Sequence, residues 1–309
     1  MKQSIIKYNH DRDFLRVRDF LKRNLIQDGK PITWGFERWN WTRFHPCMFW
    51  ADDPDKTIGN IKRFEESIRL CVADGGEILC LANIELPQEK GVVHFQHSPK
   101  GDFFLQTLFE YAEANLADEE SGIIKTYIYD YDDALKDAAS KRGWRMNPDC
   151  KNHMAEYLIS TAPPKNLPDG FVLSSMAEDG DFAQRCRLNG LGFNHPDPKD
   201  WTVPAEYRVV QQAPDYRPEL DLYVKTDDGE YISGCIVWYD DYNKAITFEP
   251  VCTIPEYRRR GFGREVLMEG IRKGMAMGAT RAFVGSSQEF YKAVGFEMKY
   301  PDHEWIKDV

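Results

Sequence analysis

The residues best suited to chemistry form a basic turn that follows a strand-like segment. Residues 245–254 are rich in β-branched and aromatic side chains, and Pro255 removes a backbone donor and ends the predicted strand. Hydrophobic residues recur at helical spacing from about residue 266 to residue 278. Between them lie four arginines and two glycines, in the run Arg258, Arg259, Arg260, Gly261, Phe262, Gly263 and Arg264. The sequence therefore predicts a strand, a basic turn and a helix.

Such a turn is suited to binding an anion. The first N–H groups of a helix have no partner within the helix, and the helix dipole adds partial positive charge there. Glycine lets the oxygens of a ligand approach these N–H groups, and arginine supplies bidentate donors. We predict a pyrophosphate site at residues 258–264. The alternative is a solvated basic turn that caps a helix.

The same residues carry a family resemblance. Arg258-x-x-Gly261-x-Gly263 resembles the Arg/Gln-x-x-Gly-x-Gly/Ala signature of the GNAT acetyltransferases, which use acetyl-coenzyme A. Phe290-Tyr-Lys-Ala-Val-Gly-Phe296 resembles their second signature, Tyr-x-x-x-Gly-Phe, although the Asn that often precedes it is missing here. The resemblance implies acetyl-coenzyme A as co-substrate, and the scattered cysteines predict no metal site. It also implies that the pantetheine arm pairs with the backbone of Val251, Cys252 and Thr253.

Acetyl transfer from a thioester to an amine needs a group that removes the amine proton and a group that protonates the departing thiolate. Glu249 lies two residues before Val251 on the same strand face, so we predict it as the base, with a structural carboxylate beside Pro250 as the alternative. The resemblance implies that the Tyr291 hydroxyl is the acid; the alternative is a packed aromatic. We interpret Cys252 as inert packing, not as a nucleophile.

Two further segments have candidate roles in binding the acceptor. His195 and Trp201 lie in a long insertion after a predicted helix at 179–191, and we predict that they border the acceptor pocket. A loop-capping His and a core Trp are the alternatives. The aromatic block at residues 34–50 is interpreted as core between two domains, with a cleft wall as the alternative.

The length of 309 residues suits two domains, and the chain contains a weak internal repeat. Gly143-Trp and Gly295-Phe are separated by the same offset as Val72 and Val224. We predict a mixed α+β fold with two tandem GNAT-like domains, each a mixed, mostly antiparallel central sheet flanked by helices. The predicted boundaries are a degenerate domain at 1–160, a linker at 161–169 and a catalytic domain at 170–309.

The first half differs at the position of the basic turn. His97-Ser-Pro-Lys-Gly101-Asp102 stands there, with one glycine and an added carboxylate. We therefore predict that only the second half binds acetyl-coenzyme A.

The remaining elements are predicted from periodicity and turn residues. In the first half we expect strands at 2–8, 68–73, 77–85, 92–96, 123–129 and 154–159, and helices at 11–26, 102–116 and 134–141. In the second half we expect further strands at 171–174, 221–225, 231–239 and 281–285, a helix at 289–294, and an edge strand at Trp305-Ile306.

Composition limits the function classes. The sequence has no apolar run of membrane length and no apolar signal-peptide core, and its seven cysteines are scattered without a Cys-x-x-Cys pair. We expect reduced thiols, a cytoplasmic protein and no membrane partner. The net charge of −10 argues against nucleic acid and suits a cationic acceptor. The protein is expected to be a monomer or a homodimer.

These observations predict an acyltransferase: an N-acetyltransferase that moves an acetyl group from acetyl-coenzyme A to a primary amine of a small molecule by direct attack. The alternative is a non-catalytic acyl-coenzyme A sensor or regulatory module with the same fold. A third hypothesis, an interaction scaffold, predicts no coenzyme A binding, and the intact turn at 258–263 argues against it.

Overall fold

The computed structural model describes residues 4–309, so positions 2 and 3 of the first predicted strand lie outside the described residues. The first half contains β1 (Ser4–Lys7), α1 (His10–Asn24), β2 (Ile26–Gln27), β3 (Lys30–Pro31), α2 (Phe36–Arg43), α3 (Pro54–Ser67), β4 (Arg69–Val72), β5 (Ile78–Asn83), β6 (His94–His97), a 3-10 turn η2 (Pro99–Phe104), α4 (Leu105–Asn115), β7 (Ile123–Tyr129), α5 (Asp133–Lys141) and β8 (Arg145–Leu158).

The second half repeats much of this order. It contains β9 (Phe171–Ser175), α6 (Met176–Asp179), α7 (Phe182–Gly192), α8 (Pro204–Tyr207), β10 (Asp221–Thr226), β11 (Tyr231–Asp240), β12 (Ala245–Thr253), η6 (Pro255–Tyr257), α9 (Phe262–Ala276), β13 (Arg281–Val284), α10 (Glu289–Val294) and β14 (Glu297–Asp308). Short 3-10 turns lie at η1 (Pro46–Met48), η3 (Pro198–Asp200), η4 (Val210–Gln212) and η5 (Pro218–Leu220).

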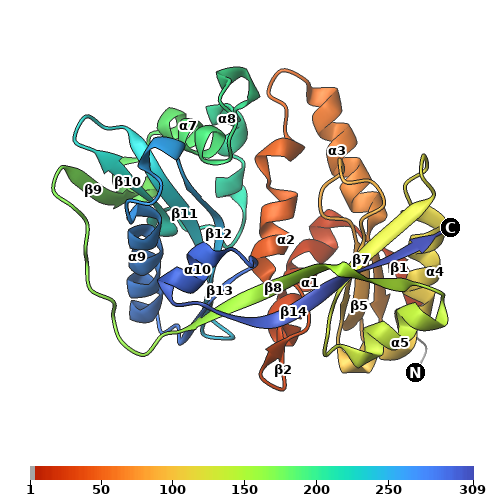
Figure 1. The fold of residues 1–309 in the computed structure, drawn as a ribbon. Coiled ribbons are helices and arrows are strands. Elements are labelled where there is room, and N and C mark those ends of the chain that lie inside the picture. The colour runs from red at the N-terminus through yellow and green to blue at the C-terminus, as the bar shows by residue number, and fades with distance from the viewer. Residues whose placement is uncertain (1–3) are drawn as a thin grey trace.

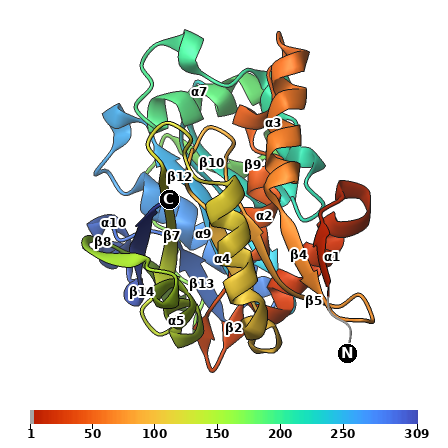
Figure 2. The same ribbon diagram turned by 90° about the vertical axis from the view of Figure 1, so that its right-hand side faces the viewer.

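The strands form a four-stranded sheet, β1-β4-β5-β6, and an eight-stranded sheet, β7-β14-β8-β13-β12-β11-β10-β9. Side chains alternate between the two faces of strand β4. Leu70 and Val72 lie in a core that also contains residues of α1, α2 and α3. Cys71 lies in a second core, with residues of α4 and α5. Helix α4 lies on the outer side of the first half in Figure 2. Helix α2 lies between the two halves (Figure 1) and contacts β12.

The two halves are joined by their last strands. In Figure 1, β8 and β14 run side by side from one half to the other. The end of β8 pairs with β13, Arg281 opposite Leu158, whereas the end of β14 pairs with β7, Asp308 opposite Ile123. Strand β8 therefore begins in the first half and ends beside β13 of the second half, whereas β14 begins in the second half and ends beside β7 of the first half.

This exchange corrects two predictions. The strand predicted at 154–159 starts earlier, at Arg145, because its first residues pair with the end of β14. The predicted edge strand around Trp305 is not at an edge, because β14 lies between β7 and β8. Four helices within the described residues, α2, α3 and the short α6 and α8, were not predicted.

Helix α9 packs closely on β12 and so fixes the position of the turn between them. Val266, Leu267 and Ile271 are buried in the core of the second half. A Cβ atom on Gly270 would lie 2.4 Å from the Phe248 ring, so only glycine allows this approach. None of the helices within the described residues combines the length and the apolar character of a membrane span.

Candidate active site

The two strands on either side of the predicted site separate along their length. Strand β12 pairs with β13 only from Ala245 to Thr247, opposite residues 281–283. On its other side β12 stays paired with β11 as far as Thr253. The backbone of residues 251–253 therefore has a strand partner on the β11 side and none on the β13 side, which leaves room for an extended group to pair with it.

A β-bulge in β12 holds Glu249. Cys235 of β11 lies opposite Val251 and Val237 lies opposite Phe248, so two residues of β12 face one residue of β11. The Trp238 indole Nε1 donates a hydrogen bond to the Glu249 carbonyl oxygen at 2.8 Å and fixes the bulge. The Glu249 side chain is 28% exposed, and its Oε2 lies 3.9 Å from an Arg38 nitrogen.

The charge of Glu249 depends on its surroundings. Burial raises the pKa of its carboxyl, Arg38 lowers it, and Glu85 raises it, with a net upward shift. A raised pKa makes the carboxylate a better proton acceptor, as a general base requires.

The backbone of the basic turn is open. Gly261 has φ +90°, a conformation that favours glycine, and it precedes α9 without a side chain capping the helix. A Cβ atom on Gly263 would lie 3.1 Å from the Phe290 ring and 3.2 Å from Thr253 Oγ1. The open space at the start of α9 therefore lies at Gly261, where an anion can approach the backbone, whereas the Phe290 ring covers Gly263. Phe262 is buried and can offer an anion only backbone atoms.

The four arginines of the turn have different surroundings. Arg258 donates from Nε to the Thr253 carbonyl at 2.9 Å and from a terminal nitrogen to the Gly192 carbonyl at 2.9 Å, so it braces the turn against α7. The Arg260 guanidinium lies 4.9 Å from the Tyr257 ring centre. Arg264 pairs with Glu265 at 3.0 Å. Within residues 4–309, Arg259 is exposed and forms no ion pair.

One cavity of about 640 Å³ collects the predicted catalytic and acceptor residues. Its lining includes Glu249, Val251, Tyr291, His195 and Trp201. Tyr291 is 7% exposed, and burial raises the pKa of its hydroxyl, with smaller contributions from Cys235, Glu249 and Cys252. The hydroxyl therefore keeps its proton at neutral pH and is available as a donor.

The family comparison covers this region. Residues 191–296 match the family described as "Acetyltransferase (GNAT) family". This part of the chain is therefore similar to a GNAT-family domain. The comparison with curated proteins gave no match.

The whole chain also resembles solved GNAT structures. A GCN5-related N-acetyltransferase from Sphaerobacter thermophilus has a TM-score of 0.57 and 14% identity, over 99% of this chain and 95% of that chain. A tandem GNAT protein from the clavulanic acid biosynthesis pathway has a TM-score of 0.60 and 10% identity, over 99% of this chain and 98% of that chain. These similarities confirm the predicted fold class.

Two residues of the GNAT domain have mainly packing roles. The Cys252 sulfur is buried near the Leu188 carbonyl at 3.8 Å, and burial raises the pKa of its thiol to about 11, although Arg185 lowers it. It therefore lacks thiolate character. Trp201 donates from its indole to the His195 carbonyl at 2.8 Å and covers Gly190, where a Cβ atom would lie 2.1 Å from the ring.

Several first-half residues near the site were missed. Arg38, which approaches Glu249, lies on α2, and Glu85 follows β5. The aromatic block at 34–50 divides its roles: Phe36 joins a core with β11, as predicted, whereas Trp34 lines a cavity beside Glu249. The adjacent charged residues Glu37 and Arg38 within the aromatic block were the available signal.

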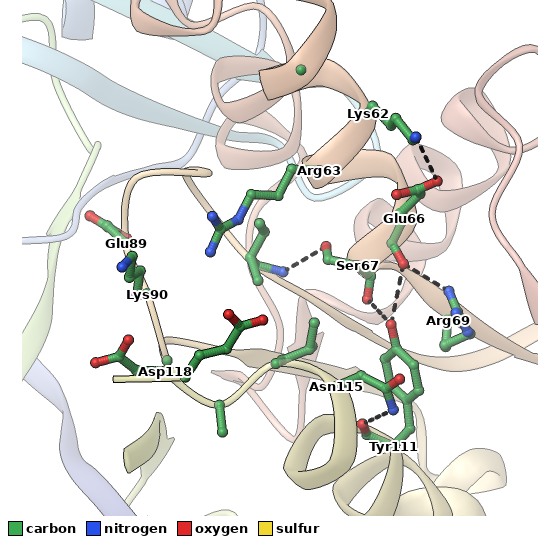
Figure 3. A pocket seen from close by; sticks show the side chains of 16 residues that line it. Lys62, Arg63, Glu66, Ser67, Arg69, Glu89, Lys90, Tyr111, Asn115 and Asp118 are labelled. Atoms are coloured by element: carbon green, nitrogen blue, oxygen red, sulfur yellow. Dashed lines mark hydrogen bonds and ion pairs between the residues drawn. The ribbon is translucent and has the colours of Figure 1, made fainter. Parts of the chain in front are cut away.

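A separate hollow of about 520 Å³ lies on the first half, between α3, α4 and residues 89–91. Figure 3 shows its charged side chains, including the Lys62–Glu66 pair, whose atoms lie 3.9 Å apart. None of the predicted site residues lines it. Within residues 4–309 no group of three or more His, Cys, Asp and Glu side chains is placed to hold a metal ion.

Proposed function

We propose that the protein is an N-acetyltransferase that transfers an acetyl group from acetyl-coenzyme A to a primary amine of a small molecule. The observation that carries the proposal is one cavity lined by Glu249, Tyr291 and the part of β12 that β13 leaves unpaired. A base, an acid and an unpaired strand edge are the three features that the transfer needs.

Acetyl-coenzyme A fits the residues present. The unpaired edge at Val251–Thr253 matches the amides of a pantetheine arm, and the uncapped start of α9 matches a pyrophosphate. Arg259 and Arg260 lie at the same turn and supply positive charge, whereas Arg258 holds the turn in place and Arg264 pairs with Glu265. The co-substrate would supply an activated thioester carbonyl.

The chain's own residues would then move two protons. Glu249 accepts a proton from the ammonium form of the acceptor, directly or through a water, so the nitrogen lone pair becomes available. As the new N–C bond forms and the C–S bond breaks, the sulfur leaves with the bonding electrons. Tyr291 donates its hydroxyl proton to that sulfur, the acetylated nitrogen releases its second proton to solvent, and the tyrosinate takes a proton back from solvent.

The test combines calorimetry of acetyl-coenzyme A binding with thiol release in the presence of a panel of small amines. Binding with amine-dependent thiol release supports the proposal. Binding without release under any amine would favour the alternative, a coenzyme A sensor. Absence of binding would overturn both.

A further inference from the structure

A second cavity, of about 590 Å³, lies beside Glu249 between the two halves. It shares Glu249 and Gly285 with the cavity that holds Tyr291, so Glu249 stands between the two. The first half contributes Trp34, Arg38 and Tyr127, and the exchanged strand β14 contributes Asp302. The half without a basic turn thus forms much of this cavity.

One wall of the cavity is a row of rings from two strands and the loop before α2. His94 of β6 lies between Trp34, at a ring-centre distance of 4.6 Å, and Tyr127 of β7, at 6.2 Å. His94 is 8% exposed, and its Nε2 has no hydrogen-bond partner within the described residues. Burial lowers the pKa of His94 to about 4, so the wall is uncharged at neutral pH. Aromatic faces of this kind attract cations.

The positive charges in the cavity are already neutralised. Arg38 pairs with Glu85 at 2.5 Å. Lys125 pairs with Glu304 at 3.5 Å, and this glutamate does not line the cavity. Lys90 pairs at 2.7 Å with a glutamate outside the lining, Glu120.

Two carboxylates of the lining have no such partner. The hydrogen bond recorded for the Asp302 carboxylate comes from the Asn152 amide at 3.5 Å, and Glu89, at the exposed rim, forms no ion pair within residues 4–309. Glu37 adds little charge, because burial raises its pKa to about 8 and keeps it mostly protonated at pH 7. The cavity therefore has an excess of negative charge.

We propose that this cavity binds the acceptor and that the acceptor is a small amine with a second cationic group. The reacting nitrogen lies at Glu249, and the distal cation lies at Asp302 against the Tyr127 ring, because the Arg38 guanidinium already lies 5.4 Å from the Trp34 ring centre. A zwitterion with a carboxylate is disfavoured, because Arg38, the cation nearest Glu249, is already paired. This inference rests on the acetyltransferase function proposed above.

Three four-carbon amines test the charge preference: 1,4-diaminobutane, 1-aminobutane and 4-aminobutanoate. A charge-assisted hydrogen bond contributes about 1.5–3 kcal/mol, so kcat/KM for the diamine should exceed that for the monoamine about 10- to 100-fold. Equal values for the two, or the highest value for 4-aminobutanoate, would overturn the inference.

The variant Asp302→Asn tests the location. It should raise KM for the diamine about tenfold, leave kcat nearly unchanged, and leave KM for 1-aminobutane unchanged. The matched control is Asp308→Asn, on the same strand, where the exposed carboxylate pairs with Arg145 outside the cavity. An unchanged KM in Asp302→Asn, or the same increase in Asp308→Asn, would contradict the location.

Calorimetry separates this inference from the proposed function. The diamine is titrated into the protein with and without coenzyme A, and we expect it to bind. Asp302→Asn should weaken diamine binding, whereas its affinity for acetyl-coenzyme A should equal that of the wild type. Diamine binding without acetyl transfer would support the cavity and overturn the enzyme. Acetyl transfer to monoamines, with no effect of Asp302→Asn on diamine binding or turnover, would support the enzyme and overturn the proposed acceptor cavity.

Discussion

The turn after β12 and the turn after β6 occupy the same place in the repeated order of elements, but they use their residues differently. After β12, Gly261 adopts φ +90°, and no heavy atom beyond its chain neighbours lies within 4 Å of its Cβ position, so the backbone there is open. After β6, η2 leads directly into α4, and a Cβ atom on Gly101 would lie 2.4 Å from the Leu79 carbonyl oxygen. The glycine of the first half serves internal packing, whereas that of the second half leaves the helix start open.

The side chains follow the same division. His97 bonds Asp102 and Asp132, each at 2.8 Å, so two carboxylates and a buried imidazole fill the first turn. The second turn holds arginines, of which Arg259 and Arg260 are exposed. The shared topology sets the position of both turns, and the residue types decide which of them can receive an anion. The predictions below test this difference.

The largest effect is expected at Gly263. Gly263→Glu places a carboxylate at the start of α9, where a Cβ atom alone would already lie 3.1 Å from the Phe290 ring. Calorimetry should detect no acetyl-coenzyme A binding, and Arg260→Glu should weaken binding by about tenfold or more.

The matched control in the first turn is Lys100→Glu, because Lys100 is exposed and its charge change is the same as that of Arg260→Glu. It should leave binding unchanged. Two coenzyme A sites per chain, or loss of binding in the control, would remove the asymmetry. Gly101 is unsuitable as a control because its substitution would disturb packing against β5.

Glu249→Gln should lower the rate about a thousandfold at neutral pH, within the range typical of general bases. The amide keeps the shape but accepts no proton, so the rate should recover partly at high pH, where the amine is already neutral. The measurement is the pH profile of kcat/KM. A profile like that of the wild type would assign Glu249 to holding the bulge instead.

Tyr291→Phe should lower kcat about a hundredfold and leave acetyl-coenzyme A affinity nearly unchanged, because the ring keeps its packing against Phe290 and Phe296. Single-turnover kinetics, with the chemical step shown to limit the rate, measure this. Tyr242→Phe, on the exposed β11–β12 turn, is the control and should behave as the wild type. If Tyr291→Phe also does so, its hydroxyl is not the acid.

The sequence predicts local elements better than the relations between halves. The strand at Ile123–Tyr129 and the helix at Glu289–Val294 were predicted with the observed bounds, because each has a clear period and clear ends. Helix α3 was missed although Asp53 caps it and Pro54 begins it, a usable signal. Helix α2 shows no apolar stripe, because Phe36 and Trp39 lie in different cores.

The candidate site divides in the same way. The turn at 258–263 is a local pattern and can be predicted, whereas the cavity beside Glu249 arises from Trp34, Arg38 and Asp302, which only the exchange of β8 and β14 and the position of α2 bring together. The hydrophobic periodicity within a strand does not indicate that the strand will pair with a strand of the other half.

The last prediction concerns the stability of the first turn. Burial lowers the pKa of His97, but the hydrogen bonds that its ring N–H groups donate to Asp102 and Asp132 outweigh this and raise the pKa to about 9, above the usual value of 6.5. A histidine whose pKa is higher in the folded state stabilises the fold fully below about pH 6.5 and loses that contribution as the pH rises through about 9.

The variant His97→Gln removes the titration of this side chain. Between about pH 7 and about pH 9 the wild type should therefore lose about 2 kcal/mol more unfolding free energy than the variant. Denaturant unfolding at the two pH values measures this, and the difference from the variant cancels other groups that titrate in the same range, such as Glu37. Equal pH dependence in both proteins would show that the charge of His97 does not stabilise the first turn. Acetyl-coenzyme A affinity should stay the same in His97→Gln, because only the second turn is proposed to bind it.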